Sequence, residues 1–131
     1  MMKKIFAFVL VAGTAAALMS ADKGEQIMTR EDGAYVVNTT TLGKDVMGYE
    51  GPTPLKVYIR KNKIEKIEFL PNQETPKYWN AAKKHLAEKW NGMAVKNVKT
   101  TQVDGRTGAT FSSDAIKQNV KLAAEYYQKN K

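Results

Sequence analysis

The sequence predicts an α+β domain, with a small antiparallel sheet and two main amphipathic helices packed against it. One observation is a period-2 apolar pattern through residues 55–69, which is typical of a half-buried hairpin. The other is a pair of apolar stripes with helical spacing in the second half of the chain. The chain has 131 residues and no Cys, so we expect one modest core that no disulfide supports.

Residues 1–21 have the features of a secretory signal peptide. Two lysines precede an apolar run over residues 5–19, and small residues follow it. This run is shorter than the ~20 residues that a membrane-spanning helix needs. We therefore expect an exported protein, periplasmic or on the outer face of the cytoplasmic membrane, with residues 22–31 as a flexible lead-in and residues 32–131 as the folded domain.

Two strand pairs are expected in the first half of the domain. The β-branched run at 35–41 and the glycine-containing stretch at 42–51 predict a strand that turns and returns. The stronger pattern begins at Leu55, where apolar and polar residues alternate as far as Arg60, and a polar turn at 61–63 leads into a second strand. Pro71 is expected to end this hairpin.

The period changes to that of a helix after Pro76. An apolar stripe predicts an amphipathic helix that Asn91 and Gly92 close; its members are Trp79, Ala82, Leu86 and Trp90. His85 lies beside the stripe, and we interpret it as a packing residue without an active role. Residues 93–103 alternate weakly and are expected to contain a short strand.

A last helix is predicted from Ser112 or Ser113 to Gln128. One of its faces is apolar, and three lysines are expected in solvent on the other. The apolar face consists of Ile116, Val120, Ala123 and Tyr127. This helix is expected to pack on the sheet.

The run from Asp104 to Thr110, Asp-Gly-Arg-Thr-Gly-Ala-Thr, is the most informative stretch of the chain. Gly108 and Ala109 leave the backbone beside Thr110 open, so a bulky phosphorylated ligand could approach its hydroxyl. The helix that follows would direct its first N–H groups and positive dipole end at an anion. However, a Gly-containing turn followed by a Ser cap also begins many helices that bind nothing, and the residue types alone favour that interpretation.

The same run resembles the recognition motif of the FMN-binding domain family: Asp, two variable residues, Ser or Thr, Gly, Ala, then Ser or Thr. Every fixed position is met, and a chance match is expected in on the order of one in a thousand chains of this size. The resemblance covers approximately residues 32–127, including Asp32–Tyr35, Gly51–Val57 and Asn72–Pro76. The family includes small exported flavoproteins that resemble the flavin-bearing subunits of the sodium-pumping NADH:quinone reductase and of the Rnf complex.

The resemblance implies that FMN is attached to Thr110 through a phosphoester, because the last Ser or Thr of the family motif carries the flavin. It also implies maturation by a separate flavin transferase that uses FAD and a metal ion. The implied cofactor-binding residues are Thr110, Asp104, Thr107, Gly108, Ala109, Ser112, Glu74 and Thr75. No catalytic residue or metal ligand is assigned to the chain itself, which has one His and no Cys.

The chain departs from the family pattern at Lys77, Tyr78 and Trp79, where many members have glycines. These aromatic residues could stack against the flavin ring, or they could form the first apolar turn of a helix that packs inward. We favour the packing interpretation.

The formal net charge of +8 raises the question of an anionic partner. The lysines are scattered among glutamates and form no aromatic-basic recognition motif, so no nucleic-acid partner is expected. We favour a solvated surface as the explanation of this charge, and the alternative is attraction to an anionic membrane face or an acidic redox partner.

The implied function is electron transfer, as a carrier or redox subunit rather than a stand-alone enzyme. The alternative is a non-redox exported binding module of the same fold that recognises an anionic ligand or a protein partner.

Overall fold

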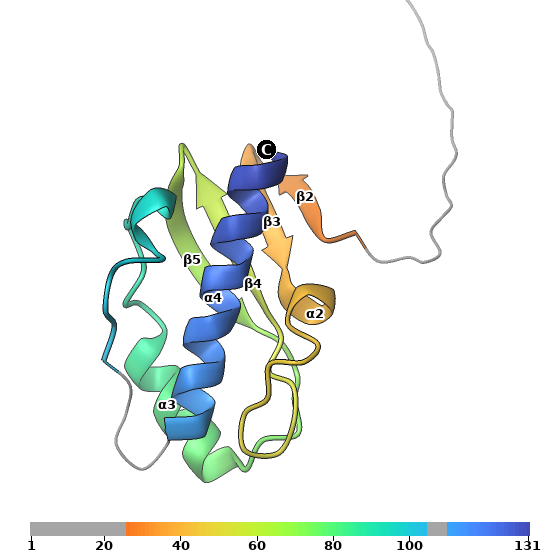
Figure 1. The fold of residues 1–131 in the computed structure, drawn as a ribbon, viewed down its shortest axis with the longest axis vertical. Coiled ribbons are helices and arrows are strands. Elements are labelled where there is room, and N and C mark those ends of the chain that lie inside the picture. Colours follow the sequence, from red (N-terminus) through yellow and green to blue (C-terminus); the bar gives the residue numbers. More distant parts are fainter. Residues whose placement is uncertain (1–25, 105–109) are drawn as a thin grey trace, which may run out of the picture.

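The computed structural model describes residues 26–104 and 110–131. Its elements are β2 (Met28–Glu31), β3 (Ala34–Asn38), α2 (Thr39–Leu42), β4 (Leu55–Arg60), β5 (Lys63–Phe69), α3 (Pro76–Leu86), the 3-10 turn η3 (Val95–Asn97) and α4 (Thr110–Asn130). The strands form an antiparallel sheet in the order β2-β3-β4-β5, and α4 crosses one face of this sheet (Figure 1). The predicted α+β class is confirmed.

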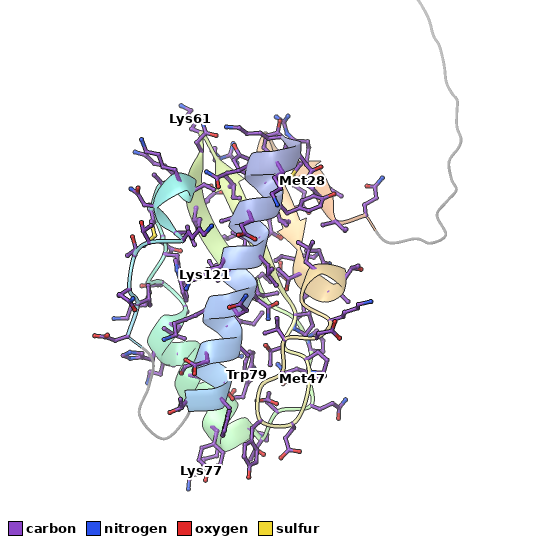
Figure 2. The ribbon with its side chains drawn as sticks, viewed as in Figure 1. Met28, Met47, Lys61, Lys77, Trp79 and Lys121 are labelled. Atoms are coloured by element: carbon purple, nitrogen blue, oxygen red, sulfur yellow. The ribbon has the colours of Figure 1, made fainter. Side chains whose placement is uncertain are left out.

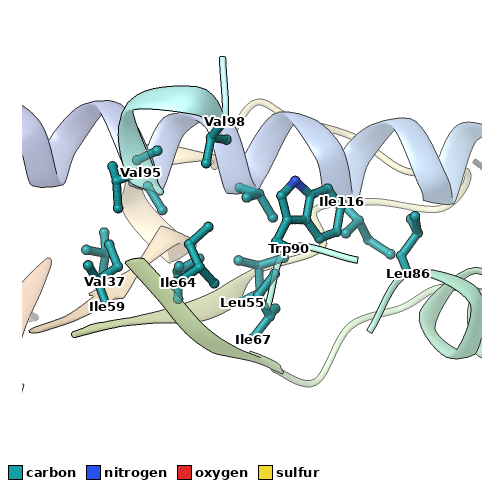
Figure 3. Packing of buried hydrophobic residues seen from close by; sticks show 14 of the residues in the cluster. Val37, Leu55, Ile59, Ile64, Ile67, Leu86, Trp90, Val95, Val98 and Ile116 are labelled. Carbon is teal, nitrogen blue, oxygen red and sulfur yellow. The ribbon is translucent and has the colours of Figure 1, made fainter. Parts of the chain in front are cut away.

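The core lies between α4 and the sheet (Figure 3). The predicted apolar face of α4 is buried, with Ile116, Val120 and Ala123 fully inaccessible. They meet the inward-facing residues of β4 and β5, among them Leu55 and Ile64. Each large aliphatic side chain buried in this way contributes about 1.5–3 kcal/mol of apolar transfer free energy. This layer fixes the direction of α4.

The predicted hairpin is β4–β5. Lys61 and Asn62 make its two-residue turn, both with positive φ (53° and 64°), a conformation whose twist matches that of the strands. The register shifts between Tyr58 and Ile59, which is a β-bulge. Because of this bulge, Ile64 and Ile67, three residues apart, both face the core.

Strand β2 lies within the segment that the sequence analysis treated as a flexible lead-in. Met28–Glu31 pairs with β3 through a turn at Asp32 and Gly33, whose φ values are 50° and 85°. An Asp-Gly pair with two positive φ angles is a strong hairpin former. The ordered sheet therefore begins at Met28, and the Asp-Gly turn is the pattern that could have predicted it.

The expected return strand over residues 42–51 is not formed, and Thr39–Leu42 is the short helix α2. Asn38 caps this helix, since its side chain accepts a hydrogen bond from the Thr40 N–H at 2.8 Å. Strand β3 already has β2 and β4 on its two sides, so no edge is left for another partner. Residues 43–54 instead form a long loop with one isolated bridge, Met47 to Pro52.

Two further expectations near the second helix were wrong in detail. Helix α3 ends at Leu86, and Trp90 lies in the following turns, although its side chain is buried. The strand expected within residues 93–103 is the single turn η3, which buries Val95 and Val98 on one side because a 3-10 turn repeats every three residues.

The packing interpretation of the α3 entry is confirmed for Trp79. Its side chain is buried and meets Phe69 edge-to-face, with ring centroids 5.7 Å apart. Tyr78, by contrast, is exposed. Within the described part of the chain, no helix has the length and apolar character to cross a bilayer.

Candidate functional site

Thr110 is the first residue of α4, and it is exposed. The start of α4, the start of α3 and loop 43–54 lie at the same end of the molecule (Figure 1). In Figure 2, Lys77 marks the start of α3 and Met47 marks loop 43–54. Asp104 is also exposed. Thr107, Gly108 and Ala109, the other predicted members of the motif site, lie outside the described residues. The structure therefore gives the positions of the two ends of the motif.

Glu74 is the centre of a buried polar network beside Thr110. Its carboxylate oxygen Oε1 accepts a hydrogen bond from the Tyr49 N–H and another from the Ser112 hydroxyl, each 2.8 Å long. Oε2 accepts from the N–H groups of Glu50 and Gly51. The side chain is only 6% exposed, so four donors compensate for its desolvation.

Three successive backbone N–H groups thus surround one carboxylate, which is the geometry of an anion-binding nest. Gly48 makes this approach possible, because a Cβ at that position would overlap Glu74 Oε1. The carboxylate also lies at the N-terminal end of α4, where a negative charge is favourable. The resemblance implied a cofactor contact for Glu74. In the structure its carboxylate ties loop 43–54 to the start of α4.

Ser112 and Thr75 occupy different positions in this network. The buried Ser112 hydroxyl donates to Glu74 and so belongs to the protein's own hydrogen bonding. Thr75 is the exposed N-cap residue of α3, and its side chain makes no capping hydrogen bond. Of these two predicted cofactor residues, Thr75 is the more accessible.

An exposed aromatic pair lies next to Thr110. The rings of Tyr49 and Phe111 have centroids 5.9 Å apart and are tilted by 40°. Tyr49 is 63% exposed and Phe111 is 62% exposed. Sequence reasoning did not identify either residue. The glycines on both sides of Tyr49–Glu50 and the position of Phe111 directly after Thr110 are the patterns that could have done so.

Residues Val103 and Asp104, at the start of the motif, are contacted by side chains from α3 and α4. His85 Nε2 lies 3.2 Å from the backbone oxygen of Asp104, and Lys117 Nζ donates to the backbone oxygen of Val103 at 3.2 Å. His85, expected only to pack, thus contacts the first motif residue. Lys117, expected in solvent, is partly buried and also lies 3.4 Å from Asp114.

A second buried network holds the other end of loop 43–54. Asn119 Nδ2 donates to the backbone oxygen and the hydroxyl of Thr53, at 2.9 and 3.2 Å. Thr39 Oγ1 accepts from the Leu55 N–H at 3.0 Å. Among the described residues Asn119 Oδ1 has no hydrogen-bond partner; it faces the Cα of Gly43, where a Cβ would overlap it.

An open cavity of about 380 Å³ lies on the α3 side of Glu74. Its lining includes Trp79, Asn80 and Lys83, but not Thr110, Tyr49 or Phe111. The aromatic pair and this cavity are therefore separate surfaces. Among the described residues, no group of three or more His, Asp and Glu side chains is arranged to hold a metal ion.

The fold and the ordered helix start define a class: a small α+β domain that presents a hydroxyl at the N-terminus of its longest helix. A family model described as the FMN-binding domain matches residues 48–125, which is more than half of the chain. The chain belongs to the FMN-binding domain family. The matched segment includes Glu74, Thr110 and Ser112 and supports flavin binding, with FMN as the flavin. No curated protein matches the chain.

Proposed function

We propose that this protein is an exported flavoprotein that transfers electrons, with FMN esterified to Thr110. The observation that carries this proposal is the position of Thr110. Thr110 is exposed. It is the last residue of the motif Asp-x-x-Thr-Gly-Ala-Thr and the first residue of α4, and it lies inside the region that the family model matches. A hydroxyl in that position is accessible to a bulky phosphorylated donor.

The residues around Thr110 fit a tethered phosphate. The first turn of α4 contains no acidic side chain, so the positive dipole end of the helix favours a phosphodiester at its first residue. The buried carboxylate of Glu74, which bonds Ser112 in this turn, is already satisfied by its four donors. Its hydrogen bonds are therefore made within the protein.

The attachment step needs an enzyme. Thr110 Oγ would attack the flavin-side phosphorus of FAD, the pyrophosphate bond would break, and AMP would leave while the hydroxyl proton passes to a base. A threonine hydroxyl is not ionised at neutral pH, so a base and a charge-neutralising cation must be supplied. A flavin transferase is the partner that supplies both.

Bound FMN would accept and release electrons, and the protein would bind, orient and shield it. The leader-like residues 1–21 support export to the periplasm or to the outer face of the cytoplasmic membrane. There a covalent tether prevents loss of the flavin by dilution. The net charge of +8 supports encounters with an anionic membrane face or an acidic redox partner.

Intact-mass measurement tests the attachment. The full chain is exported together with a flavin transferase, alongside Thr110→Ala, Thr110→Ser and the control Thr101→Ala, which removes an exposed threonine outside the motif. We expect a mass gain of one FMN minus one water in the wild type, in Thr110→Ser and in Thr101→Ala, and none in Thr110→Ala.

A wild-type protein that stays unmodified beside an active transferase would contradict the proposal. It would favour the alternative of a non-redox binding module. A modified protein whose flavin cannot be reduced and reoxidised would retain the attachment but contradict the electron-transfer role.

A further inference from the structure

Two aromatic rings are left in water at the point where the flavin would be tethered. Four large apolar side chains are exposed among the described residues: Met47, Tyr49, Tyr78 and Phe111. Tyr49 and Phe111 are the two most exposed of them and lie against each other. Clustered exposed apolar side chains, unlike single ones, mark binding surfaces.

One carboxylate oxygen links the two segments that carry these rings. Glu74 Oε1 accepts from the backbone N–H of Tyr49 itself and from the hydroxyl of Ser112, the residue after Phe111. Loop 43–54 and the first turn of α4 are therefore held together directly beneath the pair. A buried carboxylate is expensive to maintain, and in this position it sets the relative position of two exposed aromatic residues.

We propose that Tyr49 and Phe111 form an aromatic platform on which the isoalloxazine ring of the tethered FMN packs, and that Glu74 is the positioning residue of this platform. The inference rests on the proposed attachment at Thr110, the residue next to Phe111. A planar conjugated ring is the occupant that suits two tilted aromatic side chains, through offset or edge-to-face contacts. Because the tether raises the local concentration of the ring, individually weak contacts suffice to hold it.

The structure provides a matched control. Tyr78 is also exposed, at 42%, but it lies in the first turn of α3, and Lys77 Nζ lies 5.7 Å from the centroid of its ring. It has no contact with Glu74 or Phe111 in the structure's hydrogen bonds and ring pairs. Tyr78→Ala therefore deletes an exposed tyrosine while the Tyr49–Phe111 pair and the hydrogen bonds of Glu74 keep all their members.

The experiment compares full-length FMN-loaded proteins made with a flavin transferase: the wild type, Tyr49→Ala, Phe111→Ala, the double variant and Tyr78→Ala. Intact mass establishes that FMN is attached in each sample. Flavin fluorescence and visible circular dichroism then report on the ring, since a contacting phenol quenches excited flavin by electron transfer and an ordered site makes the flavin optically active. We expect several-fold brighter fluorescence and loss of the visible dichroism in the double variant, smaller changes in the single variants and none in Tyr78→Ala.

Ser112→Ala and Glu74→Gln test the positioning role. Ser112→Ala removes one donor to Glu74, and Glu74→Gln replaces an acceptor oxygen by an amide NH₂ that faces N–H donors. Measured well below the unfolding temperature of each variant, both should weaken the visible dichroism at an unchanged mass gain, Glu74→Gln more strongly. A purely structural role would lower the unfolding temperature and leave the optical signal of the folded, loaded protein unchanged.

The outcomes separate the two proposals. If the wild type gains no FMN mass, both the attachment and the platform are overturned. If the mass gain is present in the wild type and the double variant, but fluorescence and dichroism are the same in both, the platform alone is overturned. The pair would then be a surface for a protein partner.

Discussion

Helix α4 contacts two regions of the molecule that are held together differently. Toward the sheet it packs apolar side chains such as Ile116 and Val120 against β4 and β5. Toward loop 43–54 it presents polar groups, and Ser112 and Asn119 make buried hydrogen bonds to Glu74 and Thr53. Apolar packing is non-directional and supplies stability, whereas buried hydrogen bonds are directional and fix position. The end that carries Thr110 lies in the polar region.

Ile116→Ala tests the apolar region and should have the largest effect on stability. The side chain is fully buried in the main cluster, so its truncation leaves a cavity and should lower the free energy of unfolding by about 2–5 kcal/mol. Chemical denaturation measures the change. In molecules that remain folded, FMN attachment should continue, because Thr110 and Glu74 are not in the altered layer. A loss of attachment in folded protein would break the distinction between the two regions.

Gly48→Ala tests the polar region, with Gly51→Ala as its matched control. A Cβ at Gly48 would overlap Glu74 Oε1, whereas a Cβ at Gly51 would have no atom within 4 Å. Displacing the carboxylate should cost about 1–3 kcal/mol and separate loop 43–54 from the start of α4. Thermal unfolding and visible dichroism of loaded protein should change in Gly48→Ala only. Equal behaviour of the two variants would contradict the role given to Glu74.

Raising the pH should produce the smallest change in the free energy of unfolding. The affected group is Tyr58, in strand β4 of the sheet. The hydrogen bond from the Tyr58 hydroxyl to Glu68 (2.8 Å), together with burial, raises the pKa of Tyr58 to about 12. Below about pH 10 the hydroxyl is protonated in both folded and unfolded chains, and its stabilisation is complete. Between about pH 10 and 12 the unfolded chain releases the proton first, so stability falls as pH rises.

Tyr58→Phe should remove part of that alkaline loss, as measured by denaturation across this pH range. Burial also raises the pKa of Tyr127, so a second part should remain. An alkaline slope identical to that of the wild type would show that the Tyr58–Glu68 pair contributes nothing.

The difference between the apolar and the polar contacts of α4 also explains how much of the molecule could be predicted from its sequence. The β4–β5 hairpin and the apolar face of α4 follow from hydrophobic period, because burial selects residues at regular spacing. Strand β2 was missed although Asp32-Gly33 encodes its turn. In Thr39–Leu42 the β-branched residues favour a strand, but the Asn38 cap and the bond from Leu55 to the Thr39 hydroxyl favour α2.

The site was less predictable because it depends on contacts between distant residues. The motif could be recognised locally, and the predicted start of the last helix, Ser112 or Ser113, lies two or three residues after the actual start at Thr110. By contrast, the bond from Ser112 to Glu74 joins residues 38 apart in the sequence, and that from Tyr49 joins residues 25 apart. No local pattern specifies that the carboxylate of Glu74 faces backbone N–H groups instead of a ligand. Tyr49 and Phe111 were missed for the same reason, since their pairing exists only after the chain has folded.

The length of α4 separates the two ends of the domain. Its 21 residues extend about 30 Å from Thr110 to the C-terminal end of the chain (Figure 1). An affinity tag, a fluorophore or a surface linkage placed on Lys131 would therefore stay clear of the transferase and of the prosthetic group. Immobilised in that way on an electrode, the molecule would point its coloured end toward solution, where soluble mediators could reach it.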